Sequence, residues 1–98
     1  MAKAIWSAQA TQEFKELISY LKQYNPMSAA KAASEIKSIS RLLARRPFLG
    51  RPGRREGERE FSVTDWSKVF VYRITSEGID ISTLRDPRMQ PKQDDTDA

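Results

Sequence analysis

The sequence predicts an α+β fold in two layers, with an N-terminal strand, a helical hairpin and then a three-stranded antiparallel sheet. Two observations predict it. Up to about residue 46, apolar residues recur at spacings of three and four, whereas from residue 59 they stand in short runs rich in β-branched and aromatic side chains. Short turns separate those runs, which favours antiparallel pairing. A single domain is expected over residues 1–88, followed by an acidic tail over 89–98 that is predicted to be disordered.

The N-terminal part begins with a short extended segment. Residues 2–6 (AKAIW) suit an edge strand or a first strand, and Ser7 is a good N-cap for a helix that begins at residue 8. The helix predicted over residues 8–24 has one apolar face, formed by Ala10, Phe14, Leu17, Ile18, Leu21 and Tyr24.

Asn25 and Pro26 separate this helix from a second one. The residue before a proline avoids the helical conformation, so Asn25 can cap the next helix while Pro26 takes its first position. Alanines on the inner face of this helix, predicted over 27–46, let two helices approach closely, and a hairpin is expected. That face consists of Ala29, Ala32, Ala33, Ile36, Ile39, Leu42 and Leu43. Met27, like Ile36 and Leu43, is interpreted as a core residue and not as a contact to a cofactor.

The second half of the chain is predicted to form three strands, over 59–63, 68–75 and 79–84. Residues 65–67 and 76–78 make the turns between them, which predicts a meander. The nearly continuous apolar run VFVY in the second strand is typical of a central strand that helices cover.

Positive charge is concentrated between the two halves. Residues 41–59 carry seven arginines against Glu56 and Glu58, a local net charge of +5 in a chain whose total is +4. Glycines and Pro52 disfavour a helix or a central strand here, so this basic segment is predicted to be a connection. Arginine forks suit phosphate and carboxylate groups, and the segment is interpreted either as a recognition surface or as a solvated loop.

The residue types limit the chemistry that the chain can perform. It has no cysteine, which excludes disulfides and thiolate metal sites, and no histidine, which removes the commonest acid–base side chain and metal ligand. Acidic residues are scattered outside the tail, so neither a metal nor a cofactor is predicted. No apolar run approaches the ~18 residues of a membrane span, and the first residues lack the apolar core of a signal peptide. A soluble, cytoplasmic protein is expected.

Catalysis without histidine would need arginine, lysine, tyrosine or glutamate to stabilise charge and move protons. Candidates in and beside the basic segment are Arg59, Glu60, Tyr72, Arg73, Arg85 and Arg88. Each also has a structural interpretation, because Tyr72 alternates with Val71 and suits a core, and the glutamates suit pairing with neighbouring arginines. Spacing alone does not support an enzyme, and no catalytic residue is assigned.

The order of these features resembles the RelE/ParE superfamily of bacterial toxins, and most closely its ParE branch. The likeness rests on WSAQA (6–10), YLKQYNPMSAAKAASEI (20–36), RPFLGRPGRREGEREF (46–61) and VFVYRI (69–74). The third stretch is the most specific, since a proline and a Leu-Gly-Arg precede a turn and a Gly-x-Arg-Glu that enters a strand.

The resemblance implies a toxin that an antitoxin, encoded beside it, wraps and neutralises. It implies DNA gyrase as the target in the ParE branch and mRNA in the ribosomal A site in the RelE branch. Many ParE-like members end the last strand in a His-Gly-Arg segment, where this chain has Asp86, Pro87 and Arg88. That departure argues further against a ribonuclease.

The hypothesis is therefore a ParE-like toxin that inhibits gyrase by protein binding, with direct nucleic-acid binding expected only for a RelE-type toxin. The alternatives are such an mRNA interferase, with Arg59, Arg73 and Arg88 as phosphate clamps, and a decayed relative that only binds its antitoxin. The residues expected to contact the target are Arg51, Arg54, Arg55, Arg59, Arg73, Arg85 and Arg88. Those expected to contact the antitoxin are Leu17, Leu21, Leu42, Leu49, Val69 and Val71.

Overall fold

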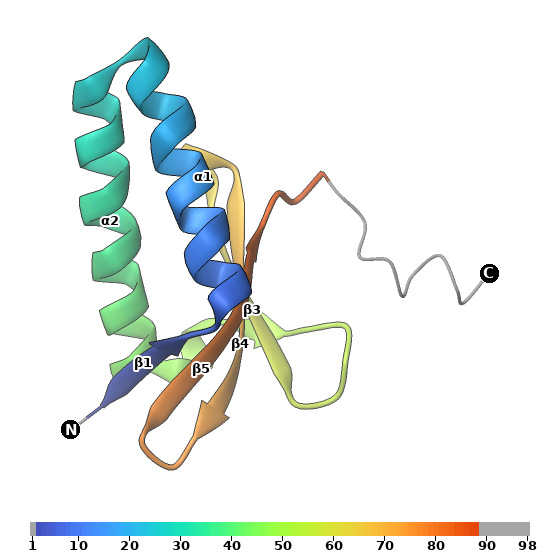
Figure 1. Ribbon diagram of the computed structural model, residues 1–98. Coiled ribbons are helices and arrows are strands. Elements are labelled where there is room, and N and C mark those ends of the chain that lie inside the picture. The colour runs from blue at the N-terminus through green and yellow to red at the C-terminus, as the bar shows by residue number, and fades with distance from the viewer. Residues whose placement is uncertain (1, 89–98) are drawn as a thin grey trace.

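The computed structural model describes residues 2–88 and has an α+β architecture, as predicted (Figure 1). The predicted acidic tail lies outside the described residues. The elements in chain order are β1 (Lys3–Trp6), α1 (Ala8–Tyr24), α2 (Pro26–Arg45), a 3₁₀ turn (Pro47–Leu49), β2 (Arg51–Pro52), β3 (Glu58–Val63), a second 3₁₀ turn (Thr64–Trp66), β4 (Lys68–Thr75) and β5 (Gly78–Arg85).

The predicted caps of both helices are confirmed. The Ser7 hydroxyl oxygen accepts a hydrogen bond from the Ala10 N–H at 2.9 Å, and the same hydroxyl donates to the Ser82 carbonyl at 2.7 Å. Asn25 accepts from the Met27 N–H at 3.0 Å. Each cap satisfies a backbone donor that the first turn of a helix leaves free. Ser7 also ties the start of α1 to the last strand.

The sheet has five strands in the order β1-β5-β4-β3-β2, so the prediction of a three-stranded sheet was incomplete. β1 pairs in parallel with β5, with Lys3 opposite Gly78 and Trp6 opposite Ile81. β2 has only two residues and pairs with β3 at the other edge. Pro52 is compatible with this edge position because its missing N–H is not needed for a further strand. β4, which contains VFVY, is the central strand, as predicted.

The two helices lie side by side over one face of the sheet and enclose the core with it (Figure 1). The partly buried Trp6 ring packs against this core, 5.5 Å from the Phe14 ring and 5.6 Å from the Phe70 ring. Its indole N–H donates to Ser40, so its polar atom is also satisfied. Buried core residues are Ala10, Ile36, Leu43, Ala44, Val63, Phe70, Tyr72, Ile79, Ile81 and Leu84.

The apolar inner faces predicted for the two helices extended too far toward the hairpin turn. The interpretation of Met27 as a core residue was wrong, because 83% of this residue is exposed, and Tyr24 is 71% exposed. Both lie at the turn between the helices (Figure 1), where the apolar period continues past the part of the hairpin that packs on the sheet. The Tyr24 ring instead lies 5.0 Å from the Tyr20 ring on the surface.

Within residues 2–88, no helix is long and apolar enough to cross a membrane.

Candidate functional site

A groove with a volume of about 1230 Å³ runs between α1, the first half of β4 and the end of β5. Its apolar lining comes from both layers of the fold. The α1 residues Leu17, Tyr20 and Leu21 form one wall, and Val71 and Leu84 belong to the sheet. Trp66, in the turn before β4, also lines it, and its indole N–H donates to Glu35 of α2 at 2.7 Å. The groove is therefore a joint product of the hairpin and the sheet.

Glu13 holds α1 against the sheet at one side of the groove. β1 pairs only with residues 78–81 of β5, so the second half of β5 is paired with β4 on one side and has no strand on the other. There the Glu13 carboxylate accepts hydrogen bonds from the Leu84 N–H at 2.8 Å and from the Thr83 hydroxyl at 2.7 Å. A side chain thus partly closes an edge that another strand would otherwise be able to pair with.

The groove is mixed in charge. Five basic residues line it, namely Arg54, Arg55, Lys68, Arg85 and Arg88, together with six acidic ones, Glu13, Glu16, Glu58, Glu60, Asp65 and Asp86. The excess positive charge of the basic segment is therefore not reproduced in the groove. The groove therefore presents apolar surface together with charged side chains of both signs.

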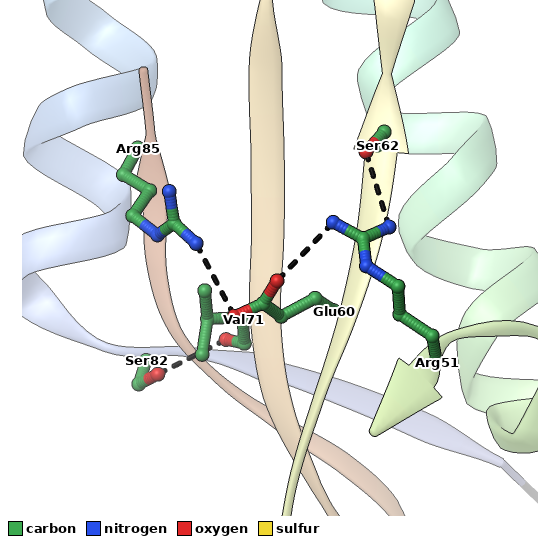
Figure 2. A network of polar contacts seen from close by, with 6 residues as sticks. All are labelled: Arg51, Glu60, Ser62, Val71, Ser82 and Arg85. Carbon is green, nitrogen blue, oxygen red and sulfur yellow. Dashed lines mark hydrogen bonds and ion pairs between the residues drawn. The ribbon is translucent and has the colours of Figure 1, made fainter. Parts of the chain in front are cut away.

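One buried carboxylate organises two of the predicted arginines (Figure 2). Glu60 on β3 is only 7% exposed, and its two oxygens face Arg51 and Arg85, each at 3.2 Å. Arg51 also donates to the Ser62 hydroxyl at 3.2 Å. Because a buried carboxylate needs both charge and hydrogen-bond partners, Glu60 holds Arg51 of β2 and Arg85 of β5 across the face of the sheet.

Arg73 and Arg88 are also engaged by oxygens of the chain itself. Arg73 donates to the Glu56 carbonyl at 3.0 Å and lies 3.9 Å from the Glu58 carboxylate. Arg88 forms a two-point contact with Asp86, at 3.1 and 2.8 Å. Hydrogen bonds from Arg88 hold the pKa of the Asp86 carboxyl well below its usual range, and the same contact raises the pKa of Arg88.

A second polar cluster, which we call the Gly50 clamp, consists of Tyr72, Arg59 and Gly50. The buried Tyr72 hydroxyl donates to the Pro47 carbonyl at 2.5 Å and accepts from the Gly50 N–H at 3.0 Å. Arg59 donates to the Gly50 carbonyl through Nε at 3.0 Å and Nη2 at 2.5 Å. An alanine Cβ at Gly50 would lie 2.3 Å from the Tyr72 hydroxyl, so the clamp closes only around a glycine.

Replacing Tyr72 with phenylalanine is expected to lower the free energy of unfolding by about 2 kcal/mol, since the Pro47 carbonyl and the Gly50 N–H lose their partner.

Burial raises the pKa of the Tyr72 hydroxyl above 10.0, against smaller opposing effects of Gly50 and Arg59. The folded protein thus holds this proton more tightly than the unfolded chain, and the stabilisation is complete below pH 10 and lost as the pH rises above it. Urea unfolding at pH 8 and pH 11 measures both effects. If wild type and Tyr72→Phe lose the same unfolding free energy between pH 8 and pH 11, the loss does not come from the Tyr72 hydroxyl and its assigned role is wrong.

The structure distributes the predicted target-binding arginines over four places. Arg54, Arg55, Arg85 and Arg88 line the groove. Arg51 reaches Glu60, Arg59 belongs to the Gly50 clamp, and Arg73 bonds the loop before β3.

Of the predicted antitoxin-binding residues, Leu17, Leu21 and Val71 line the groove together. Val71 is only 5% exposed and Val69 only 2%, whereas Leu49 is 48% exposed and stands outside the groove. Leu42 is half-buried on α2 and also lies outside it.

Sequence reasoning missed Glu13 and Phe48. Glu13 stood out in no motif, because its partners Thr83 and Leu84 lie about seventy residues away in the sequence. Phe48 is 73% exposed, and the Arg59 guanidinium lies 5.0 Å from the centre of its ring. The sequence did contain a signal for Phe48, because two large apolar residues, Phe48 and Leu49, stand between Pro47 and Gly50 inside a basic segment. Among the described residues, no group of three or more acidic side chains is placed to hold a metal ion.

The chain matches a protein-family model, a related protein and a solved structure. A family model described as "ParE toxin of type II toxin-antitoxin system, parDE" matches residues 4–91. A Sinorhizobium fredii protein named "Putative toxin Y4kP" is 31% identical over 85 residues, which cover 87% of this chain and 88% of that protein. A solved structure, "Chromosomal ParDE TA system from P. aeruginosa", matches with a TM-score of 0.77 at 20% identity, covering 88% of this chain and 96% of that one. At this identity the structural match speaks for the fold.

Proposed function

The chain belongs to the ParE toxin family of type II toxin–antitoxin systems, and on that basis we propose that it stops growth by binding DNA gyrase in the cytoplasm. A cognate antitoxin neutralises it by lying in the groove. Membership of the family supports gyrase as the target, and the shape of the groove supports it as the place where the antitoxin binds.

The state of the arginines favours protein binding over RNA cleavage. An mRNA interferase of the alternative type would need Arg59, Arg73 and Arg88 as phosphate clamps. In the structure, each of these guanidinium groups bonds an oxygen of the chain: the Gly50 carbonyl, the Glu56 carbonyl and the Asp86 carboxylate. An arginine held in this way has its position and some of its donors already committed to the chain, and no histidine is present to move protons.

The groove suits a segment of another chain better than a small molecule. Its apolar wall of Leu17, Tyr20 and Leu21 follows one side of α1, which is the arrangement that accepts an amphipathic helix or an extended strand. Both basic and acidic side chains line it, so an antitoxin segment would find ion-pair partners of both signs.

Purified toxin is expected to inhibit supercoiling of a relaxed plasmid by DNA gyrase, or to trap gyrase-cleaved DNA. Inhibition is expected to disappear when the antitoxin is added at equal concentration, because bound antitoxin covers the groove, whose lining includes four of the arginines expected to contact the target: Arg54, Arg55, Arg85 and Arg88. The matched control is the same assay with a type I topoisomerase, which should be unaffected. Normal supercoiling at high toxin excess, from protein that still stops growth in cells, would contradict the gyrase proposal.

The two remaining hypotheses have their own readouts in the same cells. Cuts in translated messages, mapped by primer extension after induction, would favour the RelE-type alternative. Normal growth during expression of the toxin alone would favour a relative that only binds antitoxin.

A further inference from the structure

Phe48 and Leu49 form an apolar projection, which we call the knob. They are the last two residues of the 3₁₀ turn Pro47–Leu49, and 73% of Phe48 and 48% of Leu49 is exposed. Neither residue belongs to the buried core cluster. A large apolar pair that stays exposed costs hydration free energy, and it usually marks a surface that another molecule covers.

The knob is held in place by the Gly50 clamp. Tyr72 binds the backbone on both sides of the knob, at the Pro47 carbonyl and the Gly50 N–H. Arg59 fixes the Gly50 carbonyl from β3 and lies against the Phe48 ring at 5.0 Å. Since the buried strands β3 and β4 supply these anchors, the knob is presented in one conformation, and little conformational entropy is lost when it binds.

The chain around the knob is strongly basic. No acidic residue occurs between Glu35 and Glu56, and six arginines fall within residues 41–55. Arg45 and Arg46 precede the knob, separated from it by Pro47. Both are exposed and form no side-chain hydrogen bond or ion pair with any residue in the range 2–88. The surface that complements the knob is therefore apolar at its centre and acidic at its rim.

The knob and the groove differ in shape and position. Phe48, Leu49 and Arg59 do not line the groove. The groove is concave and fits a segment of chain, whereas a rigid, protruding aromatic side chain fits a preformed pocket on a folded protein. A partner in the groove and a partner on the knob thus contact different residues.

We propose that Phe48 and Leu49 insert into an apolar pocket with an acidic rim on the folded protein that this toxin acts on, separate from the groove that receives the antitoxin. The inference rests on the proposed function in that the partner is taken to be gyrase, but the growth readout below does not depend on that identity. Leu49, expected from the sequence to contact the antitoxin, becomes a target contact.

The test uses the full chain carrying Phe48→Ala together with Leu49→Ala, measured in three ways. Binding to purified gyrase is expected to weaken at least tenfold, as for a central aromatic anchor, and growth arrest to be lost. The affinity for the antitoxin and the thermal midpoint are expected to stay within about twofold and about 2 °C of wild type, because these side chains are exposed. Tyr24→Ala, a similarly exposed aromatic position at the hairpin turn, is the matched control and should still stop growth.

Three results would overturn the inference. The first is unchanged growth arrest by the double variant. The second is an equal loss of antitoxin affinity, which would place the knob in the antitoxin interface. The third is a loss of gyrase or nucleic-acid binding when Arg45→Gln and Arg46→Gln are combined, while the variant with Phe48→Ala and Leu49→Ala binds normally. That result would make the region a phosphate-binding surface. If wild type stops growth without binding gyrase and the double variant does not stop growth, the gyrase proposal fails and the knob stands.

Discussion

Replacing Gly78 with alanine is expected to lower the free energy of unfolding by about 4 kcal/mol, combining a strained backbone with a steric clash. Gly78 has a φ of +150°, a conformation that residues with a Cβ rarely adopt. An added Cβ would also lie 2.0 Å from the carbonyl oxygen of Lys3 and 2.5 Å from its nitrogen. Both are backbone atoms of β1, so relief requires β1 to move away from β5.

Chemical unfolding of Gly78→Ala beside Gly53→Ala measures this effect. At Gly53 a Cβ would meet only the Glu58 residue, no nearer than 3.1 Å, and a change of about 1 kcal/mol or less is expected there. Hydrogen exchange should locate the larger loss, since the amides of Lys3 and Ser7, which donate to the Glu77 and Ile81 carbonyls, would lose protection before those of β4. Similar stabilities of the two variants would contradict the role of Gly78 in docking β1.

Replacing Glu60 with alanine is expected to cost about 3 kcal/mol of unfolding free energy, because removing one member of a buried ion pair leaves charge without compensation. The side chain of Arg85 is only 17% exposed and would keep a desolvated charge, while that of Arg51 is 56% exposed and can turn to water. The loss should therefore come chiefly from Arg85. Figure 2 shows why one substitution affects both β2 and β5, since Glu60 lies between the guanidinium groups of Arg51 and Arg85.

A second substitution separates this effect from ordinary surface electrostatics. Glu77 lies 4.0 Å from Lys3 and both side chains are about two-thirds exposed, so Glu77→Ala should change stability by less than about 1 kcal/mol. Combining Glu60→Ala with Arg85→Leu should recover part of the loss, because no unpaired charge remains buried. If Glu60→Ala is as mild as Glu77→Ala, or if the Arg85 substitution adds to the loss, the assignment of Glu60 as an organising carboxylate is wrong.

These two positions differ in how far the sequence anticipated them. Gly78 was expected to end a turn, but its close approach to Lys3 depends on the parallel pairing of β1 with β5. Glu60 was expected to pair with neighbouring arginines at little gain. The tertiary structure instead buries it and selects Arg51 and Arg85, which are nine and twenty-five residues away.

What the sequence by itself determined was the local structure. The apolar periods, the caps at Ser7 and Asn25 and the β-branched runs predicted α1, α2 and the extents of β3, β4 and β5 to within about two residues, because helix periods, caps and turns depend on interactions across only a few positions. Only the tertiary structure decided the places of β1 and β2 in the sheet, the exposure of Met27 and Phe48, and the division of the arginines among Glu60, Gly50 and the groove. Each of those depends on atoms brought together across many residues, so burial and pairing of a side chain are set by the packing of layers and not by its neighbours in the chain.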